Sequence, residues 1–294
     1  MPTICMKING GLGNQLFQVA LGIRLAHDRE AELTLDAGAY VANEPLRTYQ
    51  LDRFRIRARR LRAEELARVR PLAMRLPTPL YRRVHLFPFL GGRTYVKERS
   101  WRFDPAIPTI DAPAYLDGYW QTERYFEPVA DLVREQLQLV DPLAEHRKRT
   151  LDILNSKVSV SLHVRRGDYV ANAETLALYG TCSSDWYERA MAAIADMTCE
   201  PTFFVFSDDP DWARANLSTR WPRHFVDPDG DGRDFEDMYL MSQCSHHIIA
   251  NSTFSWWGAW LNSRPDRIVV APAKWFANSP HDTRDMIPAG WRRM

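Results

Sequence analysis

The chain has 294 residues, of which 45% are hydrophobic and 26% charged, and its formal net charge is +1. This composition is typical of a soluble globular protein and argues against a disordered or fibrous one, and the length favours two domains over one. No run of 18 or more apolar residues occurs, and the N-terminus has no long apolar run after a basic start. We therefore expect neither a membrane-spanning helix nor a secretory signal.

The first elements predicted in chain order are a strand at 3–8, a glycine-rich turn at 9–15 and a helix at 16–28 with apolar residues at helical spacing. A second strand is predicted at 31–36. The turn lies between a strand and a helix, as phosphate loops do. It lacks the Gly-Lys-Ser/Thr of a Walker loop, and Leu16 occupies the third glycine position of a dinucleotide fingerprint, so taken alone it is a weak signal.

The middle of the chain, about 40–110, is irregular and rich in proline and arginine. Residues 53–93 hold twelve arginines and two acids, so the remainder of the chain is net negative. Three interpretations remain open for this basic segment: a solvated helical face, a surface for anionic lipid or an anionic acceptor, and nucleic acid, for which no binding motif is present. A strand end is then predicted at 114–120, and helices at 128–140 and 142–154.

From 157 onward, predicted strands at 157–163, 201–207, 246–250 and 267–271 alternate with helical patterns. This alternation indicates a parallel sheet with helices on both faces, in which ligands bind beyond the carboxyl ends of the strands. The segments HVRRGD, SDD and NSTFS each follow one of these strands.

Two adjacent arginines, Arg165 and Arg166, follow the strand that begins at 157. Buried guanidinium groups need an anion, and their planar forks match a diphosphate, whereas Asp168 offers a structural ion pair to one of them. The residues alone leave these two alternatives open.

The segment NSTFSWWGAWL places Ser252 and Thr253 where a helix begins. Such a helix start presents unpaired N–H groups to an anion, although ordinary capping explains the pattern equally well. We expect Trp256, Trp257 and Trp260 to pack in the core.

We expect no metal site. The segment DPDGDGRDFEDM begins like a calcium loop, but Met238 occupies the position that needs a bidentate glutamate. No cluster of His, Cys and carboxylate residues has metal-ligand spacing. The four cysteines are far apart and form no C-x-x-C, which favours a reduced compartment, so we expect a cytoplasmic location.

Taken together and in this order, these motifs resemble the alpha-1,2-fucosyltransferases of glycosyltransferase family 11. The segments that carry the resemblance are GGLGNQLFQVALG (10–22), GYWQTERYF (118–126), HVRRGDY (163–169), FSDDP (206–210), DMYLMSQCSHHIIANSTFSWWGAWLN (237–262) and PAKWF (272–276). Val19 and Trp120 stand where the family often has aromatic residues of another kind.

The resemblance implies an α/β fold of the GT-B type, with two Rossmann-like domains facing a central cleft. We expect an acceptor-side domain at 1–150, a donor-binding domain at 151–272 and a C-terminal segment at 273–294 that crosses back to the first domain. It also implies inverting, metal-independent transfer of fucose from GDP-fucose to the 2-hydroxyl of a galactose in a glycan, with no cofactor.

The resemblance assigns roles to individual residues. The catalytic candidates are Arg165, Arg166 and Asp168. The donor-binding candidates are His163, Arg165, Asp208, Asp209, Asp237, Ser252, Thr253, Ser255, Gly13, Asn14 and Gln15, with Asp237 accepting from guanine. The acceptor-binding candidates are Asp117, Trp120, Gln121 and Glu123. For the general base, Asp168 comes first, followed by Asp117 and Glu123, and a route in which the leaving phosphate takes the proton needs no protein base.

Two alternatives to this activity stay open: a related GDP-sugar transferase that uses another acceptor position, and a catalytically inactive GDP-binding protein. The expected partners are GDP-fucose and a galactose-containing glycan, with no nucleic acid. The basic 53–93 segment adds the hypothesis of peripheral contact with the inner membrane face, where lipid-linked glycans are built.

Overall fold

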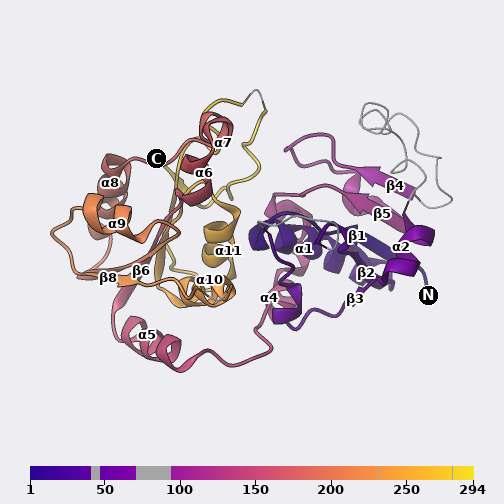
Figure 1. Cartoon of the computed structure of the whole chain (residues 1–294), viewed down its shortest axis with the longest axis horizontal. Helices are drawn as coiled ribbons and strands as arrows, with labels where there is room; N and C mark the ends of the chain where they lie inside the picture. The colour runs from indigo at the N-terminus through magenta and orange to yellow at the C-terminus, as the bar shows by residue number, and fades with distance from the viewer. Residues whose placement is uncertain (41–46, 71–93, 231, 280) are drawn as a thin grey trace. The chain divides into compact units, whose positions relative to one another are not determined.

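A computed structural model describes residues 1–40, 47–70, 94–230, 232–279 and 281–294. Their contacts divide the chain into two units (Figure 1). Unit 1 comprises Met1–Val140 and His281–Pro288, and unit 2 comprises Asp141–Pro280 and Ala289–Met294. Residues 71–93 of the basic segment lie outside the described residues.

Unit 1 is built on a five-stranded parallel sheet with the strand order β3-β2-β1-β5-β4. Its strands are β1 (Thr3–Lys7), β2 (Glu32–Asp36), β3 (Arg59–Arg60), β4 (Thr94–Lys97) and β5 (Ala114–Asp117). Its α-helices are α1 (Leu12–Asp28), α2 (Ala63–Val69) and α4 (Ala130–Gln136). Short 3-10 helices lie at Gly38–Tyr40, Leu51–Arg53, Ile107–Thr109, Glu123–Tyr125 and Glu127–Val129.

The core of unit 1 forms where the buried face of α1 meets the apolar central strand β1. Ile4, Cys5 and Met6 of β1 are fully buried, as strands covered on both faces are. Gly22 of α1 lets the helix approach the sheet closely, because a Cβ there would lie 2.7 Å from Met6 Cγ and 2.8 Å from Leu33 Cδ1.

Unit 2 contains a six-stranded sheet, also parallel, with the strand order β11-β10-β9-β6-β7-β8. Its strands are β6 (Val158–Val164), β7 (Pro201–Ser207), β8 (Arg223–Val226), β9 (His246–Ile248), β10 (Val269–Ala271) and β11 (Arg292–Arg293). Its helices are α5 (Glu145–Asn155), α6 (Gly167–Ala171), α7 (Ala173–Tyr179), α8 (Ser184–Ala195), α9 (Pro210–Asn216), α10 (Asp234–Gln243) and α11 (Thr253–Leu261).

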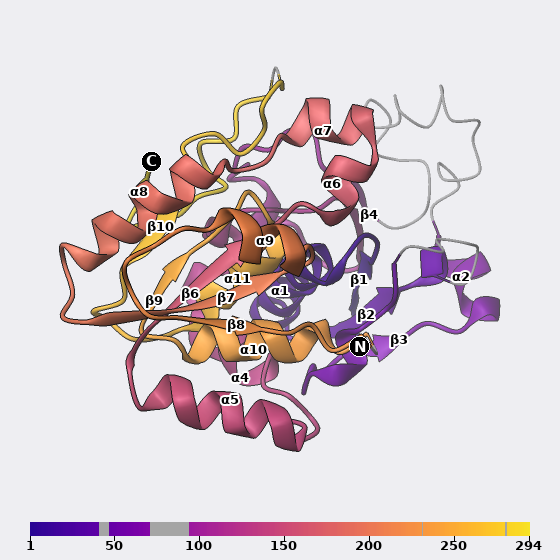
Figure 2. The ribbon, with the colours of Figure 1, turned by 60° about the vertical axis from the view of Figure 1, so that its left-hand side comes forward.

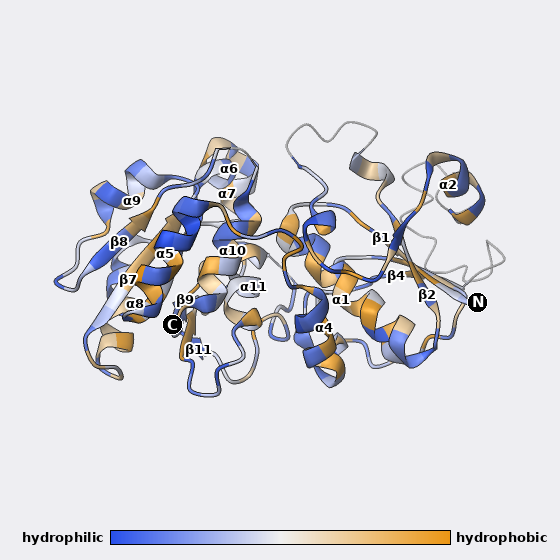
Figure 3. Cartoon of the chain, turned by 90° about the horizontal axis from the view of Figure 1, so that it is seen from below, coloured by the Kyte–Doolittle hydropathy of each residue, from blue (hydrophilic) through white to orange (hydrophobic). Residues whose placement is uncertain are grey.

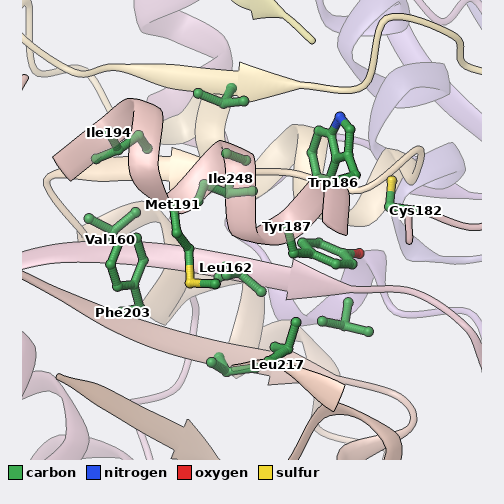
Figure 4. Packing of buried hydrophobic residues seen from close by; sticks show 14 of the residues in the cluster. Val160, Leu162, Cys182, Trp186, Tyr187, Met191, Ile194, Phe203, Leu217 and Ile248 are labelled. Carbon is green, nitrogen blue, oxygen red and sulfur yellow. The ribbon is translucent and has the colours of Figure 1, made fainter. Parts of the chain in front are cut away.

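One core cluster of unit 2 lies between α8 and the sheet (Figure 4). Tyr187, Met191 and Ile194 of α8 pack on Val160 and Leu162 of β6. The Trp256, Trp257 and Trp260 side chains of α11 are almost fully buried, which confirms that these indoles belong to the core.

Helix α5 packs against α10, and the two helices lie side by side in Figure 2. Figure 3 shows α5 mainly in hydrophilic colours, and only Arg147 and Leu154 of this helix are buried. Because α5 packs on α10, the contact boundary falls after Val140, earlier in the chain than the boundary expected at residue 150.

In both sheets the strand order reverses beside the first strand of the unit. In unit 1, β2 and β3 lie on one side of β1, and β5 and β4 lie on the other. In unit 2, β7 and β8 lie on one side of β6, and β9 on the other. Ligands of doubly wound sheets bind beyond the carboxyl ends of the strands at such a reversal, so each unit has one position where a ligand is expected.

The predicted α/β class with parallel sheets is confirmed. The helix predicted at 128–140 is shorter than expected, since Leu139 forms an isolated antiparallel bridge with Phe54. The irregular middle contains β3, β4 and α2. Within the described residues, no helix is both long and apolar enough to span a bilayer.

Candidate functional site

Three sequence motifs meet at the reversal point of the unit 2 sheet. Strands β9, β6 and β7 are neighbours, and their pairing sets Leu162 opposite Ile248 and Val164 opposite Ser207. The HVRRGD, FSDD and NSTFS segments therefore leave the sheet from adjacent strand ends. A hydrogen bond from the Tyr169 hydroxyl to the Asn251 carbonyl, 3.3 Å long, joins the first of them to the third.

Arg165 is held between two carboxylates. Its Nη2 lies 2.7 Å from Asp168 Oδ1, and its Nη1 lies 2.9 Å from Asp208 Oδ2. The guanidinium also lies 5.3 Å from the Tyr169 ring centroid. These contacts fix the orientation of the fork at the strand end, and the side chain keeps about a fifth of its surface exposed.

Arg166 is oriented by the neighbouring strand end. Its guanidinium stacks over Trp212 at 4.1 Å, its Nε lies 3.5 Å from Asp209 Oδ2, and its backbone N–H donates to Asp208 Oδ1 at 2.8 Å. Gly167 lets the chain approach Asp208 closely, since a Cβ would lie 2.8 Å from Asp208 Oδ2. The structural ion pairs raised as one alternative by the sequence are therefore present, and they hold both arginines beyond the carboxyl end of β6, where ligands of such sheets are expected. The diphosphate alternative stays a prediction.

His163 is a buried, neutral imidazole. Burial, and to a smaller degree the nearby charge of Arg165, lowers its pKa to about 3. Its ring lies 5.6 Å from that of Phe254, and its Nδ1 is buried with no hydrogen-bond partner among the described residues. A neutral ring with an unsatisfied nitrogen is suited to one hydrogen bond with a ligand.

The start of α11 combines an anchored residue, Asn251, with an N-cap residue, Ser252, that makes no side-chain capping bond. Asn251 donates from Nδ2 to the carbonyls of Tyr179 and Trp275. Ser252 is the N-cap residue, but its side chain makes no capping hydrogen bond. The first turn of α11 therefore presents backbone N–H groups that the Ser252 hydroxyl does not cap. Thr253 opens the helix, whereas Ser255 is buried and donates to the Ser252 carbonyl.

Asp237 lies in the first turn of α10, beside a buried arginine. Arg147 Nη1 lies 2.9 Å from Asp237 Oδ1, and Arg147 Nε lies 3.9 Å from both Asp229 and Glu236. Burial raises the pKa of Asp237 to about 7, and the neighbouring carboxylates add to this, while Arg147 opposes it. Arg147 itself is 1% exposed, and its Nε and Nη2 have no hydrogen-bond partner in the described part of the chain.

In unit 1, the glycine-rich turn is stabilised from within. Gln15 is fully buried and donates to the carbonyls of Gly10 and Thr48, while its Oε1 accepts from the Gln50 N–H. Gly13 is buried in the first turn of α1. Asn14 accepts from Gln121 Nε2 at 2.8 Å, so the turn after β1 is joined to the segment after β5.

The predicted acceptor residues of unit 1 are mostly engaged inside the unit. Asp117 pairs with Lys7 at 3.0 Å and accepts from the Tyr95 hydroxyl at 2.9 Å. Trp120 is 1% exposed and Gln121 is buried, whereas Glu123 opens a short 3-10 helix and is only half-buried.

Two charged residues, Arg147 and Glu98, were not predicted from the sequence as site residues. Arg147 lies inside a helix with no motif around it, and only its position on the buried face of α5 marks it. Glu98 follows β4 directly and accepts from the N–H groups of Tyr119 and Trp120 at 2.6 and 2.9 Å. No sequence pattern marked Glu98, because β4 lies in the segment that was predicted to be irregular. The described residues contain no group of three His, Cys, Asp or Glu residues that could hold a metal ion.

A comparison with protein families decides the class. The model of glycosyl transferase family 11 matches residues 92–294. The chain belongs to glycosyl transferase family 11. It is a glycosyltransferase, and the resemblance to the alpha-1,2-fucosyltransferases of family 11 is confirmed.

Relatives agree with this family 11 assignment. An alpha-1,2-colitosyltransferase of Escherichia coli is 31% identical over 100% of this chain and 99% of its own length. The O-antigen biosynthesis glycosyltransferase WbnK of Escherichia coli is 33% identical over 92% of this chain and 94% of its own. The human galactoside alpha-(1,2)-fucosyltransferase 1 is 26% identical over 60% of this chain and 51% of its own.

Solved structures confirm the fold of this family 11 chain. The NodZ alpha-1,6-fucosyltransferase soaked with GDP-fucose has a TM-score of 0.50 and 15% identity over 88% of this chain and 92% of its own. NodZ from Bradyrhizobium has a TM-score of 0.50 and 13% identity over 87% of this chain and 92% of its own. At this level of identity the match supports the GT-B type of α/β fold only.

Proposed function

We propose that this family 11 enzyme transfers L-fucose from GDP-fucose to the 2-hydroxyl of a galactose residue in a glycan, with inversion and without a metal ion. The single observation that carries the proposal is the pair Arg165–Arg166, fixed by Asp168, Asp208 and Asp209 beyond the carboxyl end of β6. A sugar that leaves its nucleotide places new negative charge on a diphosphate. Oriented guanidinium groups stabilise that charge without reorganising.

The charges around these arginines explain why a diphosphate is a suitable ligand. Asp168 and Asp208 each contact one terminal nitrogen of Arg165, and the planar guanidinium has further N–H groups that suit phosphate oxygens. The first turn of α11, whose Ser252 makes no side-chain cap, adds backbone N–H groups from the adjacent strand end.

The reaction is a single displacement. The acceptor oxygen bonds to the anomeric carbon as the bond from that carbon to the diphosphate breaks, and the electron pair leaves with GDP. The hydroxyl proton passes to a base or to the leaving phosphate. Asp168 is already paired with Arg165 at 2.7 Å, which favours an orienting role over that of the general base.

Guanine selection is assigned to unit 2. The Asp237 carboxylate is suited to accept hydrogen bonds from the N1–H and 2-amino groups of guanine, and Arg147 favours its charged form. His163, neutral and with an unsatisfied Nδ1, is suited to a hydrogen bond with the nucleoside.

Colitose is a second candidate for the transferred sugar. The observation in its favour is the alpha-1,2-colitosyltransferase, which is similar to this chain over its whole length. Colitose is 3-deoxyfucose, so the two donors differ by one hydroxyl. A site that hydrogen-bonds that hydroxyl rejects the analogue that lacks it, and an apolar site does not.

Titration and product analysis test the proposal. Isothermal titration with GDP, GDP-fucose and UDP-galactose is expected to show binding of the two guanine nucleotides only. Linkage analysis of the product from GDP-fucose and a beta-galactoside is expected to show an alpha-1,2 bond. Transfer from GDP-colitose but not from GDP-fucose would show that colitose is the transferred sugar. GDP binding without turnover across an acceptor panel would indicate an inactive GDP-binding protein.

The metal-free account has its own test. EDTA is expected to leave turnover largely unchanged, because guanidinium groups rather than a divalent cation bind the diphosphate. Loss of activity that Mg²⁺ restores would refute this part of the proposal.

Peripheral membrane contact on the cytoplasmic side is also proposed, through the basic 53–93 segment. In its described part, Arg57 pairs with Glu135, Arg59 with Glu32, and Arg70 with Asp36. Local pairs therefore compensate part of the positive charge. Flotation with anionic liposomes is expected to recover more protein than flotation with neutral ones, and equal recovery would remove the idea.

A further inference from the structure

Unit 1 has its own strand-order reversal beside β1, and on one side of it, beyond the carboxyl ends of β5 and the edge strand β4, lies a residue group with no role so far. Strands β5 and β4 end at Asp117 and Lys97, which are paired in register. The segments that follow, Glu98–Trp101 and Gly118–Trp120, therefore leave the sheet side by side beyond the carboxyl ends, where ligands of such sheets bind.

Glu98 fixes the segment after β5. Its two carboxyl oxygens accept from the backbone N–H groups of Tyr119 and Trp120, at 2.6 and 2.9 Å. Gly118 permits this approach, because a Cβ there would lie 2.4 Å from Glu98 Cβ. Trp120 has a φ of +59°, which is strained for a bulky residue.

Two aromatic residues accompany this carboxyl: Trp101 follows Glu98 by three residues, and Tyr119 donates its backbone N–H to Glu98. The rings of Trp101 and Tyr119 are parallel within 6°, with centroids 6.2 Å apart, and both side chains are partly exposed. A pyranose ring presents a face of C–H groups that packs on aromatic rings and a rim of hydroxyls that donate to carboxylates. An aromatic pair beside a fixed carboxylate offers both kinds of contact.

The same segment contains an unsatisfied polar group. The Trp120 indole N–H is buried with no hydrogen-bond partner among the described residues. The nitrogen-bearing edge of the ring faces Gly118, since a Cβ there would lie 2.8 Å from Trp120 Cε2. Strained backbone and unsatisfied buried donors are features of functional sites. The Gly118–Trp120 segment has both, in the φ of Trp120 and in its indole N–H.

We propose that Glu98, Trp101 and Tyr119 form the subsite at which unit 1 binds a pyranose of the acceptor glycan. The ring pair packs on the C–H face of the sugar, and the Glu98 carboxylate accepts a hydrogen bond from one of its hydroxyls. This inference deepens the proposed function and rests on it, since that function requires a glycan acceptor. In this subsite neither Asp117 nor Trp120 contacts the sugar. Asp117 is already paired with Lys7 and Tyr95, and Trp120 is buried.

The electrostatics of Glu98 agree with the geometry. Burial raises the pKa of Glu98 to about 7, against the effect of the two N–H donors, and the nearby charge of Asp117 adds to the rise. Carboxyl groups with perturbed pKa values gather at binding and catalytic sites.

The test is direct sugar binding to the full chain, with lactose as the probe, followed by titration calorimetry and saturation-transfer NMR. Wild type is expected to bind lactose, with transfer from aromatic protons to the galactose ring. Trp101→Ala is expected to weaken this binding at least tenfold, whereas the matched control Trp101→Phe, which keeps a ring, loses much less. Glu98→Gln is expected to weaken it several-fold. GDP affinity is expected to stay unchanged in all three variants, which shows that they fold.

Each contrary result has one meaning. Lactose binding by Trp101→Ala at wild-type affinity, or an unchanged acceptor KM in that variant, would overturn the subsite and leave the proposed function standing. Failure of wild type to bind any of a panel of pyranosides, with or without GDP, would also overturn the subsite. Wild type that binds lactose through Trp101 but forms no fucosylated product from GDP-fucose would overturn the proposed function and retain the subsite.

Discussion

The two units share a sheet plan and differ in what they place at its reversal point. In unit 2, the adjacent ends of β6 and β7 supply two arginines and three aspartates, and each of these charges lies within 3.5 Å of an opposite charge. In unit 1, the Lys7–Asp117 pair lies at the strand ends, the segments that follow carry amides and aromatic rings, and Glu98 is held by backbone N–H groups instead of a cation. Oriented charges are suited to binding a diphosphate. The aromatic rings of Trp101 and Tyr119, with the Glu98 carboxylate, are suited to binding a neutral sugar.

The contrast extends to two carboxyl groups, one in each unit, whose pKa values are raised toward neutrality. Burial raises the pKa of both Asp237 and Glu98 to about 7. Asp237 has Arg147 against it at 2.9 Å, whereas the N–H groups of Tyr119 and Trp120 contact Glu98. A different group therefore opposes the rise in pKa in each unit, a buried cation in unit 2 and two backbone N–H groups in unit 1.

The largest effect is expected from Arg147→Met in unit 2. The substitution leaves Asp229, Glu236 and Asp237 without their buried cation, which costs about 3–5 kcal/mol in the free energy of unfolding. Urea denaturation monitored by hydrogen exchange in unit 2 measures it. The control Arg149→Met, an exposed position on the same helix, is expected to change stability by less than about 0.5 kcal/mol. Wild-type stability in Arg147→Met would show that this arginine does not support the acidic cluster.

Arg165→Ala is expected to act on turnover more than on folding. Removing an oriented donor to a developing charge costs roughly 10²- to 10³-fold in kcat, or about 3–4 kcal/mol of transition-state stabilisation. The melting temperature is expected to stay close to that of wild type, because the side chain is partly exposed at the end of its strand. Arg214→Ala, which removes an exposed pair with Asp227, is the matched control with full activity. An unfolded Arg165→Ala protein would assign the residue a structural role instead.

The sequence predicted unit 2 better than unit 1, for a physical reason. In unit 2 the apolar strands, their helices and the polar residues after each strand end are contiguous in the chain, so the rule for parallel sheets brings HVRRGD, FSDD and NSTFS together. Unit 1 is interrupted by the irregular middle, and β4 and β5 are short. No periodicity could show that Glu98 and Tyr119 are hydrogen-bonded partners.

Burial was the information that the sequence lacked. Asp117, Trp120 and Gln15 were predicted as ligand contacts from the family resemblance, and the structure shows each of them in contacts within unit 1 or buried. Arg147 was missed for the opposite reason, since an arginine in a polar helix gives no sign that it points inward. Residue type indicates what a side chain can bind, and packing decides whether it is available.

Gly118→Ala tests the close approach that distinguishes the unit 1 site. A Cβ at this position would lie 2.4 Å from Glu98 Cβ and 2.8 Å from Trp120 Cε2, so the segment must shift. We expect a loss of about 1–3 kcal/mol in stability, together with weaker sugar binding. Gly290→Ala, where nothing lies within 4 Å of the added carbon, is the matched control and is expected to be neutral. Equal stability of the two variants would mean that the Glu98–Gly118 contact is not tight in solution.

The smallest effect, and the most direct comparison of the two carboxyl groups, is the pH dependence of stability. The pKa of Glu98 is about 7 in the folded protein, against an ordinary value of 4.5. The folded state therefore holds a proton that the unfolded state has released, and the free energy of unfolding falls as pH rises from about 4.5 through 7. The largest possible loss in the free energy of unfolding is about 3 kcal/mol, and partial exposure of the side chain lowers the expected loss to about 1–2 kcal/mol.

Unfolding of wild type and Glu98→Gln in urea at pH 5 and pH 8, monitored by hydrogen exchange in unit 1, measures this loss. The variant is expected to lose less stability than wild type over this range, and Asp237→Asn is expected to give the same change in unit 2. Parallel pH curves for wild type and Glu98→Gln would show that Glu98 titrates normally, and the electrostatic support for its place in the sugar subsite would be withdrawn.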